Sequence, residues 1–220
     1  MDVHTRTDAH TRVVAGGCLV AAPAVQGLST FFWNDGDQGI AAGALVVVAT
    51  VFWVTGLAAL FRLVERRAPR YAAFAFPLAV YGCVGGAAFG VQGLCEELFG
   101  VPHDTAVDLL RDHQAAAEAA FWMAGPLFPI SVFVLGAVLI RLRAVPLPAA
   151  ALMSVGAVLF PLSRIPREAV VAHLADLLLL LPFAHLGVLM AMGRLGPAKP
   201  SGAPDAEDAS DGPAPVEAVR

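Results

Sequence analysis

Charged residues are scarce in this chain. They make up 15% of its 220 residues, against 58% that are hydrophobic, whereas soluble globular domains carry roughly 25% charged residues. Lys199 is the only lysine, and all other basic residues are arginines. The formal net charge of −4, together with the lack of basic stretches with interleaved aromatic residues, argues against a nucleic-acid partner. This composition predicts an integral membrane protein.

Cysteines and the sequence motifs of common catalytic sites are also missing or rare. The three cysteines, Cys18, Cys83 and Cys95, show neither a CxxC pair nor the spacing of a zinc site, so we expect small buried hydrophobic side chains. The chain has no phosphate-binding loop, no HExxH helix and no nucleophile elbow. The sequence therefore predicts no cofactor and favours a non-enzymatic protein over an enzyme.

Six long apolar runs dominate the sequence instead. A helix needs about 20 apolar residues to cross the hydrocarbon core of a bilayer, and continuous rather than alternating runs favour helices over membrane strands. We therefore predict an all-α polytopic bundle of six transmembrane helices, embedded in the lipid bilayer. The expected spans are 13–33, 40–61, 71–94, 121–140, 145–162 and 169–192.

Arginines mark alternate connections between these runs. The stretch 62–70 holds four arginines and the stretch 141–143 holds two, whereas the connection 34–39 has no basic residue. Basic residues in short loops concentrate on the cytoplasmic side of a membrane. We therefore expect a multi-pass protein of a bacterial cytoplasmic (inner) membrane, with both termini in the cytoplasm.

The segments outside the spans differ in character. Residues 1–12 are expected to form a cytoplasmic arm, and 13–196 the transmembrane domain. The stretch 197–220 is rich in Pro, Ala, Ser and acidic residues, which predicts a disordered cytoplasmic tail because such a segment cannot bury enough apolar surface to fold.

The stretch 95–120 is the only long connection between spans. Asp104 is placed to cap a short helix there, and an apolar stripe follows it. We expect this helix either to lie on the outer surface or to extend the fourth span outward from Gly125.

Gly82, Gly86 and Gly90 recur every four residues in the third span. This glycine zipper places three residues without side chains on one helix face, where another backbone can approach closely. The favoured interpretation is packing within the chain. The alternative is a homodimer, or a contact with another membrane protein, through this face.

Ionisable residues within a membrane are costly and are therefore candidates for function. Glu96 and Glu97 close the third span, and His173 and Asp176 share one face of the sixth. These four residues are the candidate catalytic groups. With His113, the residues His173 and Asp176 are also candidate metal ligands, because a bound metal could activate water for hydrolysis.

The competing interpretation is ion pairing at the outer face. Here the carboxylates of Glu96, Glu97 and Asp176 pair with Arg164, Arg167 and Arg111. We favour this interpretation because the histidines and carboxylates are scattered over several connections and lack a fixed ligand spacing. A lone His185, deeper in the sixth span, is expected to bond to a neighbouring helix.

Several stretches resemble a group of small six-span membrane proteins of unknown function from GC-rich bacteria. They are 56–62, 66–70, 141–146 and 156–162, and Pro148 departs from the group where a bulkier residue is common. The resemblance implies six helices and supplies no activity. The Glu96–Glu97 pair is similar to the paired glutamates of intramembrane CAAX-type proteases, but Val101 stands where that signature has arginine.

Three classes of function follow from these features. The favoured one is a non-enzymatic accessory or interaction subunit, or a transporter-like bundle. The alternative is an intramembrane enzyme with an outer-face His/carboxylate site that acts on a lipid-type substrate. A transporter would need a polar cavity near the midplane, for which the candidate residues are Gln26, Thr50, Thr55, Ser131, Ser154 and His185.

Overall fold

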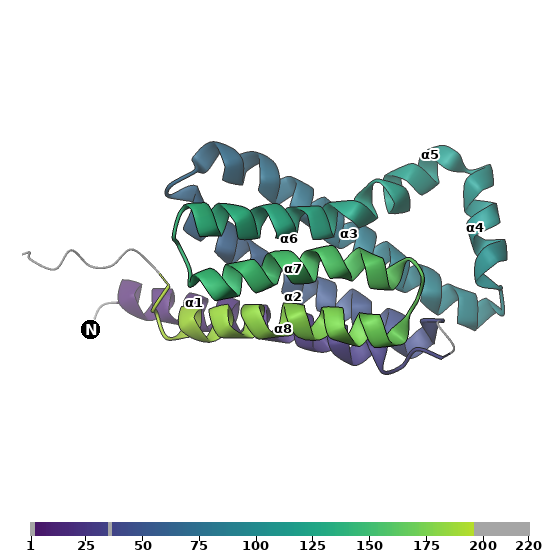
Figure 1. Ribbon diagram of the computed structural model, residues 1–220, viewed down its shortest axis with the longest axis horizontal. Helices are drawn as coiled ribbons and strands as arrows, with labels where there is room; N and C mark the ends of the chain where they lie inside the picture. The colour runs from purple at the N-terminus through teal and green to yellow at the C-terminus, as the bar shows by residue number, and fades with distance from the viewer. Residues whose placement is uncertain (1–2, 35–36, 196–220) are drawn as a thin grey trace, which may run out of the picture.

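The chain is helical in the part that the structure describes. The computed structural model describes residues 3–34 and 37–195, so the tail predicted at 197–220 lies outside the described residues. This part contains no strand, only an isolated bridge between Asn34 and Asp37, and the predicted all-α class is confirmed (Figure 1). The helices are α1 (Val3–Thr30), α2 (Gly39–Glu65), α3 (Pro69–Phe99), α4 (His103–Asp112), α5 (Gln114–Ala117), the π-helix η1 (Glu118–Trp122), α6 (Ala124–Arg141), α7 (Leu147–Arg164) and α8 (Ala169–Ala191).

Six helices are long and apolar enough to cross a membrane, which confirms the predicted number of spans. The fourth is the continuous stretch Gln114–Arg141, which joins α5, η1 and α6. Helix α1 begins at Val3, inside the predicted arm, and α3 runs beyond its predicted end at residue 94. Glu96 and Glu97 therefore belong to the last turns of α3. This helix closes at Gly100 with φ of 63°, a conformation that glycine adopts readily because it has no β-carbon.

The long helices form a closed ring. Each packs against two neighbours, in the order α1, α2, α3, α6, α7, α8 and back to α1 (Figure 1). We call the end that carries α4 and the connections 31–38 and 165–168 the α4 end. The opposite end, where α1 begins and α8 ends, is the arginine end; the arginines of its connections and adjoining helix turns are Arg12, Arg62, Arg66, Arg67, Arg70, Arg141, Arg143 and Arg194.

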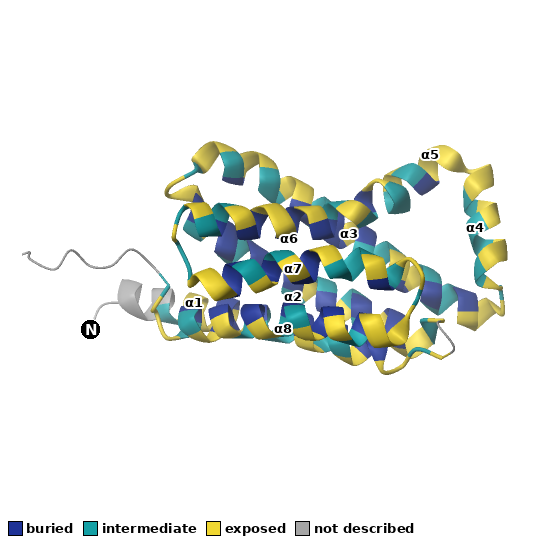
Figure 2. Ribbon diagram, viewed as in Figure 1, coloured by how far each residue is buried: buried dark blue, intermediate teal, exposed yellow. Residues whose placement is uncertain are grey.

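The apolar core fills the half of the ring that faces the arginine end. Trp53 and Leu57 of α2, Leu135 of α6 and Phe183 and Leu186 of α8 are almost fully buried there. Trp53 and Phe183 meet edge to face, with ring centroids 4.8 Å apart. Figure 2 shows the exposed residues on the outward faces of the helices. Since lipid tails are as apolar as this core, close packing rather than removal from water holds these helices together.

Of the seven buried polar side chains in the described residues, all but Ser131 of α6 lie in the other half of the ring. Glu96 of α3, Ser163 of α7, Asp176 of α8 and the residues Gln26, Ser29 and Thr30 of α1 all lie toward the α4 end. A buried polar group costs free energy unless it finds a hydrogen-bond partner. The apolar half of the bundle thus stabilises it, whereas the polar half contains buried groups whose hydrogen bonds must offset the cost of burial.

The three zipper glycines of α3 have different neighbours. A β-carbon on Gly82 would overlap the backbone of Phe128 in α6, and one on Gly90 would lie 2.9 Å from the carbonyl oxygen of Gly43 in α2. Gly82 and Gly90 thus allow close helix contacts inside the chain. A β-carbon on Gly86, by contrast, would meet nothing within 4 Å, so Gly86 faces open space inside the ring.

The long connection contains both of the predicted alternatives. Helix α4 lies at one end of the bundle, and α5 and η1 extend the fourth span outward (Figure 1). The capping prediction was wrong: Pro102 is the residue before α4, and Asp104 lies in the first turn without a side-chain capping bond. Tyr81 of α3 donates to the carbonyl oxygen of Ala119 at 2.5 Å, which ties η1 to the ring.

Candidate functional site

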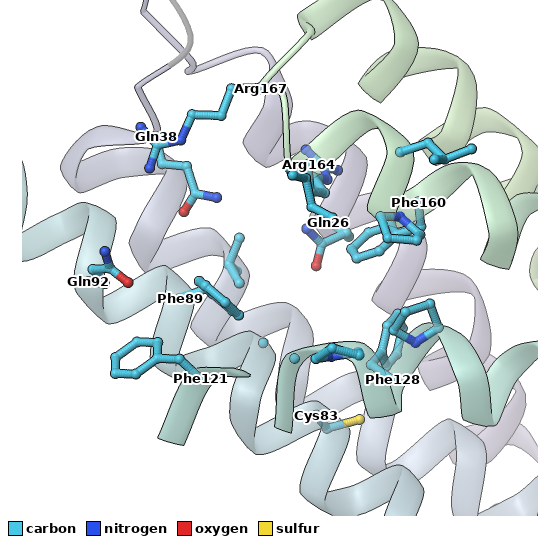
Figure 3. Close-up of a pocket in the computed structure, with 18 of the residues that line it drawn as sticks. Gln26, Gln38, Cys83, Phe89, Gln92, Phe121, Phe128, Phe160, Arg164 and Arg167 are labelled. Carbon is cyan, nitrogen blue, oxygen red and sulfur yellow. The ribbon is translucent and has the colours of Figure 1, made fainter. Parts of the chain in front are cut away.

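A cavity of about 860 Å³ occupies the centre of the ring at the α4 end. All the spanning helices except α8 contribute to its wall, and His103, Val107 and Leu110 of α4 cover it. Figure 3 shows Phe89, Phe121, Phe128 and Phe160 distributed around the cavity, with Phe160 beside Gln26. The volume falls within the roughly 300–1,000 Å³ of small-molecule pockets.

Aromatic rings from several helices form much of the cavity wall. Phe128 of α6 meets Trp53 edge to face at 5.1 Å and Phe160 of α7 at 5.5 Å. Phe89 of α3 and Phe121 of η1 meet at 5.4 Å on the facing side. These pairs hold each other in defined orientations, so the cavity has a preformed apolar surface.

Several apolar residues of α6 and α7 that line the cavity are also exposed. Ile130 and Phe133 of α6 line it and are 53% and 44% exposed. Val158 and Leu162 of α7 also line it and are similarly exposed. These side chains of α6 and α7 therefore combine contact with the cavity and substantial exposure.

Arg164, at the end of α7, is the most buried cation of the cavity wall. Its Nη2 lies 2.5 Å from Asp176 Oδ1, and its Nη1 donates to Thr30 Oγ1 at 3.0 Å. Thr30 in turn donates to Asp176 Oδ2 at 2.6 Å. The guanidinium also lies over the Trp33 ring at 4.7 Å. Such bonds help to offset the cost of burying an ion pair, although Arg164 Nε has no hydrogen-bond partner among the described residues.

Arg167 joins the connections of the α4 end. Its Nη1 lies 2.6 Å from Asp37 Oδ1, and its Nη2 lies 2.7 Å from His103 Nδ1 and 3.6 Å from Glu96 Oε2. Glu96 Oε1 lies 2.8 Å from His103 Nδ1 and accepts from Gln92 at 2.8 Å. The backbone of Arg167 has φ of 56°, a left-handed conformation that few non-glycine residues adopt. The network thus fixes α4 to α3 and to two connections.

The remaining predicted ion-pair residues make other contacts. Arg111 pairs with Asp108 within α4 at 2.7 Å, on an exposed surface, rather than with a carboxylate of the ring. Glu97 accepts a hydrogen bond from the backbone N–H of Ile40. The expected pairing of Arg111 with Glu96, Glu97 or Asp176 is therefore wrong.

The candidate metal ligands have separate surroundings. Asp176 is held by Arg164, His173 packs against the ring of Phe31 with centroids 4.4 Å apart, and His113 is exposed between α4 and α5. Within residues 3–34 and 37–195, no three His, Cys, Asp or Glu side chains are grouped so that they could hold a metal ion.

Of the residues expected to line a transporter cavity, only Gln26 and Thr50 lie in the wall of the large cavity. Thr55 bonds to the carbonyl of its own helix. Ser154 donates to the α6 carbonyl of Phe133 at 3.3 Å. His185 is exposed on α8 and makes no hydrogen bond to a described residue, so its expected bond to a neighbouring helix is wrong.

Sequence reasoning missed His103, Asp37, Gln38 and the aromatic wall. His103 stands two residues after Val101 and follows Glu96 and Glu97 closely in the sequence. This closeness could have indicated that His103 contacts one of the two glutamates. The aromatic residues carried no signal, because they are spread over five segments that only the fold brings together.

Comparisons of the chain with protein-family models, with curated proteins and with solved structures find no match to any of them.

Proposed function

We propose that this protein is a non-enzymatic membrane protein that binds an amphiphilic lipid-type molecule in the cavity of the α4 end. The observation that carries the proposal is the cavity itself. It combines aromatic rings, exposed apolar lining residues on α6 and α7, and a polar end that holds Arg164 and Arg167. An amphiphile matches this distribution because its chain can lie against the rings while its head reaches the polar end.

We further propose that the arginine end faces the cytoplasm of a bacterial cell. The arginines of this end form no ion pair with a described residue, whereas all the ion pairs in the described segments lie at the α4 end. The positive-inside rule supports this orientation. The cavity would then lie on the outer side of the cytoplasmic membrane.

Gly86 provides a direct test of amphiphile binding. Since a β-carbon there meets nothing within 4 Å, Gly86→Phe should place a ring in the cavity without displacing a helix. All three tryptophans, Trp33, Trp53 and Trp122, line the cavity. A single-chain lipid with a brominated chain, added to the protein in lipid nanodiscs, should therefore quench their fluorescence at low mole fraction in the wild type and much less in Gly86→Phe.

The matched control is Gly17→Phe. Gly17 is an exposed glycine of α1 with nothing within 4 Å of a β-carbon, and it does not line the cavity. This variant should quench like the wild type. Equal quenching curves for wild type, Gly86→Phe and Gly17→Phe would mean that the brominated chain reaches the tryptophans without entering the cavity, and the proposal would be wrong.

A further inference from the structure

A second hollow, of about 440 Å³, lies between α3 and α6 toward the arginine end. Residues three and four positions apart share one face of a helix, and one such face of each helix forms a wall. The wall residues are Tyr71, Phe74, Ala75 and Leu78 of α3, and Leu127, Ile130, Ser131 and Val134 of α6. Arg70, in the first turn of α3, completes the lining. We call this hollow the α3/α6 groove.

The groove exists because α3 and α6 touch closely at only part of their length. A β-carbon on Gly82 would overlap the backbone of Phe128, so the two helices are in contact there. Toward the arginine end, the first turns of α3 lie apart from α6 (Figure 1). Phe74 and Leu78 in the groove wall are 79% and 48% exposed. The groove is therefore a feature of the bundle surface, with walls as apolar as lipid tails.

Arginines gather where the groove meets the arginine end. Arg70 lines the groove itself. Arg67 donates through Nη1 to the carbonyl oxygen of Leu142 at 2.6 Å, which brings the connection after α2 against the connection after α6. These two adjoining connections and the helix turns beside them carry five exposed arginines, namely Arg66, Arg67, Arg70, Arg141 and Arg143.

The positive charge of this cluster is not neutralised by the protein. In the described part of the chain, none of these five arginines forms an ion pair, and Glu65 is the only acidic residue in 62–70 and 141–146. The first turn of α3 also has no acidic residue, so the positive end of its helix dipole adds to the field. At the α4 end, by contrast, Arg164 and Arg167 each have a carboxylate partner. The cluster thus complements an anion supplied from outside the chain.

We propose that the α3/α6 groove binds an anionic phospholipid. Its phosphate lies at Arg70 among the neighbouring arginines, and one acyl chain lies along Phe74 and Leu78. Basic pockets between membrane helices bind anionic head groups in this way. From Arg70 to Leu78 the helix rises roughly 12 Å, which accommodates the upper part of a chain below a head group at the membrane surface. This site is independent of the proposed function, although Ile130 borders both the groove and the large cavity.

The test of the head group uses native mass spectrometry of the protein in detergent micelles. Phosphatidylglycerol and phosphatidylcholine with identical acyl chains are added separately, and we expect the first phosphatidylglycerol to bind at least fivefold more tightly. Arg70→Gln should reduce the affinity for phosphatidylglycerol about fivefold, because one arginine near an anionic head contributes about 1 kcal/mol.

Arg194→Gln is the matched control for charge. Arg194 is an exposed arginine of the same end, but it follows α8, which packs against α1 and α7 rather than α3 or α6. This variant should bind phosphatidylglycerol like the wild type. Equal affinities of the wild type for the two lipids, or equal losses in Arg70→Gln and Arg194→Gln, would overturn the inference, since the arginines would then attract lipid without a specific site.

A second pair of variants tests the groove itself. Ala75→Phe places a ring in the groove, whereas Ala73→Phe places one on an exposed position of α3 outside it. We expect Ala75→Phe to weaken phosphatidylglycerol binding at least fivefold and Ala73→Phe to leave it unchanged. Equal binding by Ala75→Phe and the wild type would mean that no chain lies in the groove, and the inference would be wrong.

Gly86→Phe separates this site from the large cavity. Gly86 lines that cavity and not the groove, so this variant should keep its affinity for phosphatidylglycerol. A loss of affinity in Gly86→Phe without a loss in Ala75→Phe would place the phospholipid in the large cavity. That result would overturn the groove site and leave amphiphile binding in the cavity intact.

Discussion

At the scale of single residues, Arg164 is the side chain on which the stability of the α4 end depends. Its side chain is 13% exposed and that of Asp176 is 6% exposed. Two buried charges remain stable only while both are present, because removal of one leaves the other without compensation. Thr30 completes the arrangement by donating to Asp176 and accepting from Arg164.

Asp176→Asn should destabilise the protein strongly. We expect a loss of about 3–5 kcal/mol in the free energy of unfolding, since the guanidinium of Arg164 stays buried without a counter-charge. The measurement is an unfolding titration with denaturing detergent in mixed micelles. Asp108→Asn is the control: the Asp108–Arg111 pair is exposed, so its loss should change stability by less than about 1 kcal/mol. Equal effects of the two substitutions would contradict the role of the buried pair.

At the scale of helices, α3 combines two functions along its length. It packs closely against α6 at Gly82 and against α2 at Gly90, and between these contacts Gly86 faces the cavity. One glycine pattern therefore supports helix packing at two positions and leaves space for a ligand at the third. The pattern alone does not distinguish them, because each residue's neighbour depends on how α3 crosses the ring.

Alanine substitutions should separate these two roles. Gly82→Ala should destabilise the bundle by about 1–3 kcal/mol, because the added methyl group overlaps the α6 backbone and that backbone must move. Gly86→Ala should be neutral or should stabilise by up to about 1 kcal/mol, because alanine favours a helix over glycine and nothing obstructs its methyl group. The unfolding titration in mixed micelles measures both. A larger loss for Gly86→Ala than for Gly82→Ala would mean that the assignment of the two faces is wrong.

At the scale of the whole molecule, polarity is distributed along the axis of the ring. The apolar core lies toward the arginine end, and most of the buried polar residues and the cavity lie toward the α4 end. The arginines without ion pairs also lie at the arginine end. The orientation of the bundle in the membrane thus determines on which side of the bilayer the cavity lies.

Cysteine labelling tests this orientation. Glu65, at the end of α2, and Asp108, in α4, are both exposed and lie at opposite ends of the bundle. In a background in which Cys18, Cys83 and Cys95 are replaced by alanine, an impermeant thiol reagent should label Asp108→Cys in intact cells. Glu65→Cys should react only after permeabilisation, because basic connections face the cytoplasm. The reverse pattern would place the cavity on the inner side of the membrane.

Sequence patterns predicted the helices well and the site only in part. The continuous apolar runs determined the number of spans, because a bilayer leaves a helix as the only way for such a segment to satisfy its backbone. Arg164, Arg167, Glu96 and Asp176 stood out because ionisable residues near a membrane are rare. The sequence also predicted that these groups pair with one another, as Arg164 does with Asp176 and Arg167 with Glu96. It did not determine which arginine meets which carboxylate, since that depends on which helices are neighbours in the ring.

The sequence by itself determined an all-helical membrane bundle with six spans. The length and the apolar composition of each hydrophobic segment are local properties, and they suffice to predict a membrane-spanning helix. The cavity was decided only by the tertiary structure. Its wall takes residues from segments as distant as Gln26 and Arg167, and its volume exists because six helices pack side by side in a ring without one at the axis. Apolar residues that line a cavity and those that fill a core have the same pattern in sequence, and only the packing of the helices separates them.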